Sequence, residues 1–135
     1  MQPKQVVTFL GYSGQGYQNI QEILQYARNV LSQFDPKKTI VNIGVSRIGV
    51  GEIYGLAKEM NFETTGILSS KGVKYLDDIK HVDKYFITRN AMSNHQMALD
   101  KAKEIFKNKT PVVFSGASQK RFSKDHIREP YHKNL

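Results

Sequence analysis

Three cationic side chains follow short apolar runs of the sequence. Arg47, Lys71 and Arg89 each lie in or just beyond the loop that comes after such a run. Guanidinium and ammonium groups that converge on one place bind the oxygens of phosphate or carboxylate. Any one of these residues alone is typical of a solvated surface charge, but the three together predict a site for an anionic small molecule.

The loops after four of the apolar runs are built from small residues. They read Gly11-Tyr12-Ser13-Gly14, Gly44-Val45-Ser46, Ser69-Ser70-Lys71-Gly72 and Ser115-Gly116-Ala117-Ser118. Such loops let backbone N–H groups approach a ligand closely, although turn chemistry also places Gly and Ser there. Four of them together favour a pocket. The candidate ligand contacts are Gly11, Ser13, Gly14, Ser46, Arg47, Gly49, Gly51, Lys71, Arg89, Asn90 and Ser93.

The loop 44–52 has the composition of a phosphate-binding loop without a complete motif. Ser46 occupies the second glycine position of G-x-G-x-x-G, and no Asp or Glu closes the next apolar run to hold a ribose. The sequence G-x-x-x-x-G-K-[ST] is also absent. Helix N-terminal N–H groups would still favour an anion here. The glycines also suit close packing of a helix on a strand, and both interpretations stay open.

Two residues are candidates for a catalytic role. Glu52 lies at the start of a predicted helix, where its charge would also complement the helix dipole. His95 opens another predicted helix, either as a general base or as a hydrogen-bonded, partly buried side chain. No metal or other cofactor is predicted, because cysteine is absent and the remaining acidic and histidine cluster lacks ligand spacing: Asp77, Asp78, His81 and Asp83.

Alternating strands and helices must position these residues. Apolar runs of strand length alternate with stripes of helical period, and the runs lack strict polar alternation. This pattern predicts a parallel sheet with helices on both faces, a Rossmann-like three-layer α/β/α fold of about five strands. The strands are expected at 6–10, 39–45, 64–68, 85–88 and 111–115, the helices at 20–34, 53–60 and 98–106, and a weaker segment at 73–80.

The strand order decides which loops meet. With the order 3-2-1-4-5, the first, second and fourth strands flank the switch point, where open α/β sheets bind ligands. The principal pocket is then expected between residues 11–16, 46–51 and 89–93.

Composition limits the function further. The chain of 135 residues fits one domain, predicted at 1–118, followed by a basic tail at 119–135. The net charge of +8 favours an anionic partner, with nucleic acid less favoured because only the tail concentrates the charge. No signal peptide or membrane-spanning run is recognisable, so a cytoplasmic location without membrane contact is expected.

The chain resembles the LOG-type, lysine-decarboxylase-like Rossmann proteins and the wider SLOG group of nucleotide-binding domains. The segment 9–14 resembles their F-x-G-S-S sequence, and 41–70 resembles their second glycine loop, helix and V-I-G-V strand. The stretch 109–113 resembles their K-P-V-V strand. The resemblance covers residues 5–118 and implies a nucleotide-type ligand and a homodimer.

The sequence departs from this family at its catalytic motif. Residues 88–96 stand where the family has P-G-G-x-G-T-x-x-E, and Gln96 takes the place of the glutamate. A neutral amide cannot stabilise the positive charge that develops on a ribose during glycosidic cleavage. We therefore expect a nucleotide-binding module rather than an enzyme. The alternatives are a nucleotide N-glycosidic hydrolase using Glu52 or His95, and an interaction module acting through the basic tail.

Overall fold

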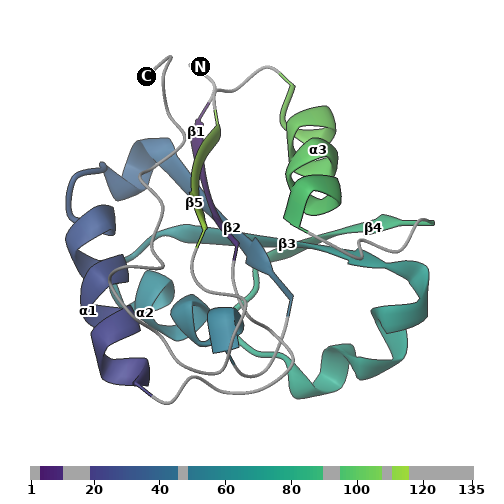
Figure 1. The fold of residues 1–135 in the computed structure, drawn as a ribbon, viewed down its shortest axis with the longest axis horizontal. Coiled ribbons are helices and arrows are strands. Elements are labelled where there is room, and N and C mark those ends of the chain that lie inside the picture. Colours follow the sequence, from purple (N-terminus) through teal and green to yellow (C-terminus); the bar gives the residue numbers. More distant parts are fainter. Residues whose placement is uncertain (1–3, 11–18, 46–48, 90–94, 108–110, 116–135) are drawn as a thin grey trace.

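The computed structural model describes residues 4–10, 19–45, 49–89, 95–107 and 111–115. Within these ranges, strands and helices alternate along the chain (Figure 1). The strands are β1 (Gln5–Leu10), β2 (Thr39–Gly44), β3 (Glu63–Ser69), β4 (Lys84–Thr88) and β5 (Pro111–Ser115). The α-helices are α1 (Ile20–Leu31), α2 (Ile53–Glu59) and α3 (His95–Ile105), and the 3₁₀ segments are η1 (Pro36–Lys38), η2 (Gly49–Glu52) and η3 (Ser70–Asp78).

The strands form one parallel sheet in the order β4-β3-β2-β1-β5. Every neighbouring pair is parallel, and Val7 on β1 stands opposite Val41 on β2 and Val112 on β5. The prediction of an α/β fold with a parallel sheet is confirmed. The predicted order 3-2-1-4-5 is wrong, because β4 pairs with β3 at the edge of the sheet and β5 takes the place beside β1.

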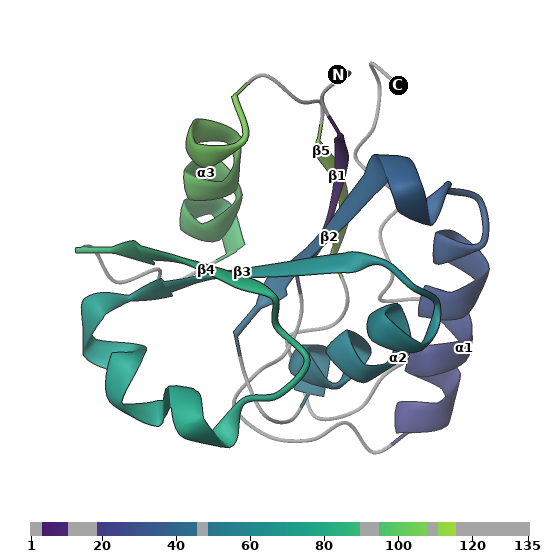
Figure 2. The same ribbon diagram turned by 180° about the vertical axis from the view of Figure 1, so that it is seen from behind.

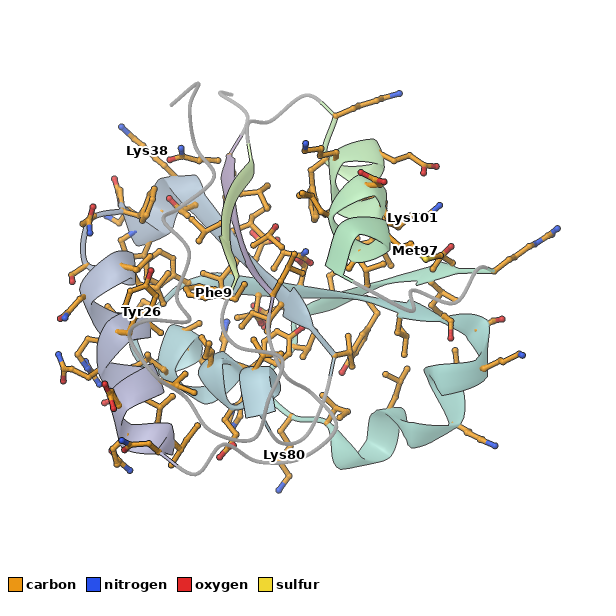
Figure 3. The ribbon with its side chains drawn as sticks, viewed as in Figure 1. Phe9, Tyr26, Lys38, Lys80, Met97 and Lys101 are labelled. Atoms are coloured by element: carbon orange, nitrogen blue, oxygen red, sulfur yellow. The ribbon has the colours of Figure 1, made fainter. Side chains whose placement is uncertain are left out.

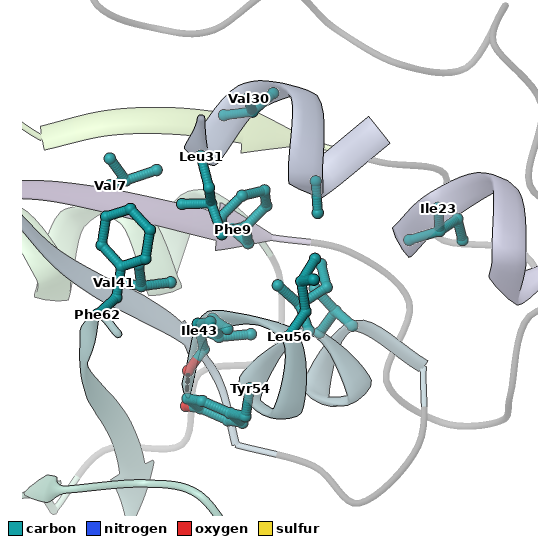
Figure 4. Packing of buried hydrophobic residues seen from close by; sticks show 14 residues of the cluster. Val7, Phe9, Ile23, Val30, Leu31, Val41, Ile43, Tyr54, Leu56 and Phe62 are labelled. Carbon is teal, nitrogen blue, oxygen red and sulfur yellow. Dashed lines mark hydrogen bonds between the residues drawn. The ribbon is translucent and has the colours of Figure 1, made fainter. Parts of the chain in front are cut away.

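The first face of the sheet is covered by α1 and α2 (Figures 1 and 2). Alternate residues of β1 and β2 point to this face, and the buried residues of α1 recur at helical spacing. Figure 4 shows these side chains interlocking around Phe9, Leu31 and Phe62. The buried cluster comprises Val7, Phe9, Ile23, Ala27, Val30, Leu31, Val41, Ile43, Val50, Ile53, Tyr54, Leu56, Ala57 and Phe62.

The opposite face is covered by α3, which completes the three layers. Ala102 and Phe106 pack with Val6, Ile40 and Ile67 from the strands. The Phe86 and Phe106 rings meet edge to face, with their centroids 5.4 Å apart. Figure 3 shows Phe9 between the two layers, with Tyr26 on the α1 side and Met97 and Lys101 on α3.

A row of polar side chains crosses the middle of this second face. Thr8, Asn42 and Thr65 stand opposite one another on β1, β2 and β3, and all three are buried. Thr65 Oγ1 donates to Asn42 Oδ1 at 2.9 Å, and Asn42 Nδ2 donates to Thr8 Oγ1 at 3.5 Å. The row is therefore connected from strand to strand, and no buried side-chain nitrogen or oxygen of the described residues lacks a partner.

Two helix ends show how the sequence sets the boundaries. Helix α1 ends at Leu31 rather than at the predicted Phe34, and Asp35 then caps η1 by accepting from the Lys37 N–H at 3.0 Å. Helix α2 ends at Glu59, and Asn61, two residues later, has a φ of 71°; the Phe62 N–H then donates to the Ala57 carbonyl at 3.0 Å. Asparagine tolerates this left-handed conformation, so the chain can turn directly into β3.

A network around Asp83 ties the start of β3 to the segment before β4. Lys58 Nζ donates to Asp83 Oδ2 at 2.6 Å, and the Thr64 N–H donates to the same oxygen at 2.9 Å. Thr64 Oγ1 in turn donates to the His81 carbonyl at 2.6 Å. Partial burial alone would raise the pKa of Asp83, but the hydrogen bonds from Lys58 and Thr64 and the Lys58 charge hold this pKa below its ordinary value.

The Asp83 network predicts a loss of stability in acid. Because the folded pKa of Asp83 is lowered, its contribution is complete above the unfolded value of about 4 and is lost as pH falls through the folded value. We expect Lys58→Met to cost less than about 1 kcal/mol at neutral pH, since solvent screens this half-exposed pair. Urea unfolding between about pH 5 and pH 2 should show a flatter acid decline for Lys58→Met than for the wild type. Parallel curves would contradict the assignment.

No helix within the described residues is long and apolar enough to cross a membrane. The predicted basic tail, 119–135, lies outside the described ranges.

Candidate functional site

The carboxyl ends of the strands lie along one edge of the sheet because all the strands are parallel. The predicted loops follow at this edge. Strands β1 and β5 end side by side, with Leu10 opposite Ser115, and β3 and β4 end with Ser69 opposite Thr88. The sequence-predicted site residues therefore belong to loops at one edge, but not all to neighbouring strands.

The switch point of this sheet lies between β1 and β5. Strands β2, β3 and β4 each pair with the strand before them, so the sheet grows in one direction from β1. Helices α1 and α2, which connect β1 to β2 and β2 to β3, lie on one face of the sheet. The connection through α3 then returns across the other face to the far side of β1. The expectation that the fourth strand flanks the switch point is wrong. A short apolar run reads alike in an edge and a central strand, so the sequence pattern could not separate β4 from β5.

The new order separates Arg89 from the first loop. Strands β4 and β1 are three positions apart in the sheet, which corresponds to about 14 Å. Lys71 follows β3, one strand nearer, and lies in η3. Both side chains are exposed, and neither forms an ion pair with another residue in the part of the chain that the structure describes.

The glycine loop after β2 is only partly within the described ranges. Its second half forms η2, with Val50 and Gly51 buried against the core, and runs directly into α2. Glu52 is partly exposed at the start of α2, and its side chain makes no capping hydrogen bond there. Packing against the core accounts for the position of Val50 and Gly51. The structure adds no feature that marks Glu52 as a catalyst.

The other predicted site residues fall partly inside and partly outside the described ranges. His95 begins α3, although the side chains of His95 and Gln96 are not among those the structure describes. The following predicted ligand contacts lie outside the described residues and stay predictions: Gly11, Ser13, Gly14, Ser46, Arg47, Asn90 and Ser93. The predicted pocket between residues 11–16, 46–51 and 89–93 rests mainly on these residues.

Tyr54 and Gly66 fix the sheet just below the candidate edge. The Tyr54 hydroxyl reaches from α2 to the backbone carbonyl of Ile43 on β2, shown as a dashed line in Figure 4, and lies 2.9 Å from the carbonyl of Thr65 on β3. Gly66 leaves space for the Tyr54 hydroxyl and the Val45 side chain, because a Cβ at this position would lie 2.7 Å from the hydroxyl and 2.5 Å from Val45 Cγ2.

The buried hydroxyl of Tyr54 is a structural hydrogen-bond donor. Burial raises the pKa of Tyr54 far above its ordinary value, and the neighbouring Tyr85 raises it further. The group is therefore neutral at physiological pH and cannot act as a base. Sequence reasoning missed this pair because a close contact between a helix and a strand leaves no periodic signal. The only hint was a glycine inside an apolar run.

Metal binding finds no support among the described residues, which contain no group of three His, Asp or Glu side chains placed to hold an ion. No protein-family model matches the chain significantly, and neither does any curated protein or solved structure.

Proposed function

We propose that the chain binds an anionic, nucleotide-type small molecule at the carboxyl edge of its sheet and does not hydrolyse it. The observation that carries the proposal is the switch point between β1 and β5. In open α/β sheets, ligands bind in the crevice that opens there. The sequences that follow these two strands, 11–14 and 115–118, are both rich in glycine and serine.

Charge favours an anion at this edge. The chain carries a net charge of +8, and basic residues follow three successive strands: Arg47 after β2, Lys71 after β3 and Arg89 after β4. A phosphate group would gain from any of these cations. The strand order favours Arg47 over Arg89 as the phosphate contact, because β2 lies next to β1 whereas β4 is the edge strand.

Binding without cleavage follows from the chemistry of the available groups. The resemblance to the LOG-type proteins places Gln96 at the position of their catalytic glutamate. Departure of a base from a ribose builds positive charge that a carboxylate stabilises, which an amide does not. We therefore propose that nucleoside monophosphates are not converted to free base and ribose phosphate.

A thermal-shift screen with nucleoside mono-, di- and triphosphates tests the proposal. A ligand present at 100 times its Kd should add about 2.7 kcal/mol to the stability of the folded state. We expect Arg47→Ala to raise the Kd about tenfold and Arg89→Ala to raise it less than about threefold. Lys37→Ala is the matched control, because Lys37 is an exposed lysine in η1, which leads into the opposite end of β2.

Three outcomes would contradict the proposal. The absence of a thermal shift with every nucleotide tested would show that the ligand is not a nucleotide. If Lys37→Ala and Arg47→Ala raised the Kd equally, the nucleotide would be held by the overall positive charge and not by a specific site. Release of free base that disappears in Glu52→Gln would show that the chain is an enzyme with Glu52 as its catalyst.

A further inference from the structure

Strand β4 leaves one side of the sheet open. No other strand in the described part of the chain pairs with its outer edge. Figures 1 and 2 show β4 at the border of the sheet beyond β3. Ile87, the fourth residue of this strand, is 57% exposed, the highest value among the large exposed hydrophobic side chains described. An open edge with an exposed apolar side chain is a template for another strand.

We propose that two copies of the chain pair β4 with β4 in antiparallel orientation, so that one sheet runs through a symmetric dimer. Strand addition of this kind supplies backbone hydrogen bonds, and side chains that face one another determine the register. A twofold axis at Phe86 brings all five residues of the strand into pairs. The edge is used once in each copy, so the assembly closes as a dimer.

The sequence of β4 is self-complementary in this register. Tyr85 faces Ile87 of the second copy on the α2 side of the sheet, and Phe86 faces its own equivalent on the α3 side. Tyr85 and Phe86 are half-buried in the single chain, so both keep surface that a partner strand can cover. Each pair joins an aromatic residue to an aromatic or β-branched one, which are favourable cross-strand combinations.

Charges at the two ends of the strand complement each other. One residue beyond each end of β4, the same register places Asp83 opposite Arg89 of the second copy, and it does so twice by symmetry. Arg89 is exposed and makes no ion pair with another described residue. Asp83 Oδ2 already accepts from Lys58 and the Thr64 N–H, so Arg89 of the second copy would share the Asp83 carboxylate with Lys58.

Lys84 tests the register, because lysine on an edge strand usually prevents association. In the proposed pairing Lys84 faces Thr88 rather than another lysine, so no like charges oppose each other. A shift of two residues in one direction would place Lys84 against Phe86 and Asp83 against Ile87. A shift of one residue would put each copy's α3 side against the other copy's α2 side. The opposite shift of two residues would place Ile87 against its own equivalent and Tyr85 against Arg89, and it would take Asp83 away from Arg89. The register centred on Phe86 is therefore the one that pairs Asp83 with Arg89 at both ends of the strand.

The dimer is expected to be moderate in strength. Five paired residues bury less surface than a standard stable interface, so a Kd on the order of micromolar is expected. Sedimentation velocity across about 1 to 500 μM protein measures it directly. We expect Ile87→Lys to raise the Kd about tenfold or more, because it removes the apolar side chain that packs on Tyr85 and puts a solvated charge on the paired edge at two symmetric places. The large exposure of Ile87 leaves folding intact, which circular dichroism verifies.

Gln21→Lys is the matched control for added charge. Gln21 is exposed on α1, which covers β1 and β2 far from β4, so this variant should dimerise like the wild type. A wild type that stays monomeric throughout the range would overturn the proposal. An Ile87→Lys variant that dimerises as well as the wild type would overturn it too, because the interface would then lie elsewhere.

Cross-linking tests the register without disturbing the apolar pairs. The chain has no cysteine, so Lys84→Cys and Thr88→Cys introduce single thiols. Directly opposed residues have Cα atoms within disulfide range, whereas two copies of the same variant hold their thiols about 13 Å apart along the strands. Mixing the two variants under mild oxidation should give cross-linked dimers well beyond the yield of either alone. Equal yields would overturn the register. None of these measurements requires a nucleotide, so their outcome is independent of the proposed function.

Discussion

Gly66→Ala is expected to lower the free energy of unfolding by about 3 kcal/mol, which corresponds to a Tm lowered by about 10 °C. The added Cβ would lie 2.5 Å from Val45 Cγ2 and 2.7 Å from the Tyr54 hydroxyl, so both neighbours must move. Moving Tyr54 breaks its hydrogen bonds to the carbonyls of β2 and β3. Urea unfolding of the purified variant measures the loss.

Gly55→Ala is the control for Gly66→Ala, and the opposite sign is expected. Gly55 lies inside α2, and a Cβ there would come no nearer than 3.8 Å to a neighbouring atom. Alanine removes backbone freedom from the unfolded chain, so stability should rise by about 0.5–1 kcal/mol. Val45→Ala combined with Gly66→Ala should recover part of the loss. A Gly66→Ala protein as stable as the wild type would show that the sheet tolerates a side chain there.

Asn42→Leu is expected to cost about 2–3 kcal/mol, because it removes the centre of the buried polar row. Leucine has the branched shape of asparagine but is larger, so the loss combines some overpacking with the hydroxyls of Thr8 and Thr65, which lose the amide that joins them. A buried hydroxyl without its partner keeps its desolvation cost. Chemical unfolding at neutral pH measures the change.

The triple variant Thr8→Val, Asn42→Leu, Thr65→Val separates polarity from packing. When all partners become apolar together, no group is left unsatisfied, and most of the wild-type stability should return. A triple variant less stable than Asn42→Leu alone would show that the row contributes through shape rather than through its hydrogen bonds.

The fold could be predicted from the sequence because its elements leave periodic signals. The stripe that contains Ile23, Ala27 and Leu31 predicted α1, and the β-branched run at 39–44 predicted β2. The strand order could not be predicted, because β4 and β5 are both short apolar runs. Which strand β5 pairs with depends on how far α3 carries the chain across the face of the sheet. No local sequence pattern indicates this distance.

The candidate site was less predictable than the fold. Parallel strands predict that their carboxyl ends lie at one edge, and the structure places the ends of β1 and β5 side by side there. The loops that follow these two strands lie outside the described residues and stay predictions. The distance of Arg89 from the end of β1 depends on the strand order, which the sequence pattern did not reveal. The polar row had a readable signal, since Thr8, Asn42 and Thr65 interrupt three otherwise apolar strands, but their alignment appears only once the register is known.

The pairing of β5 with β1 has a consequence for how the chain folds. Strands β1 to β4 join neighbours that follow each other in sequence, so each contact closes a loop of modest length. Val6 and Pro111, in contrast, meet across nearly the whole described chain, and closing so long a loop is entropically costly and slow. We therefore expect β5 to dock last, onto a sheet that is already assembled. The carboxyl ends of β1 and β5 come together only in that final step. A ligand bound between them, as proposed above, would therefore stabilise the docking of β5.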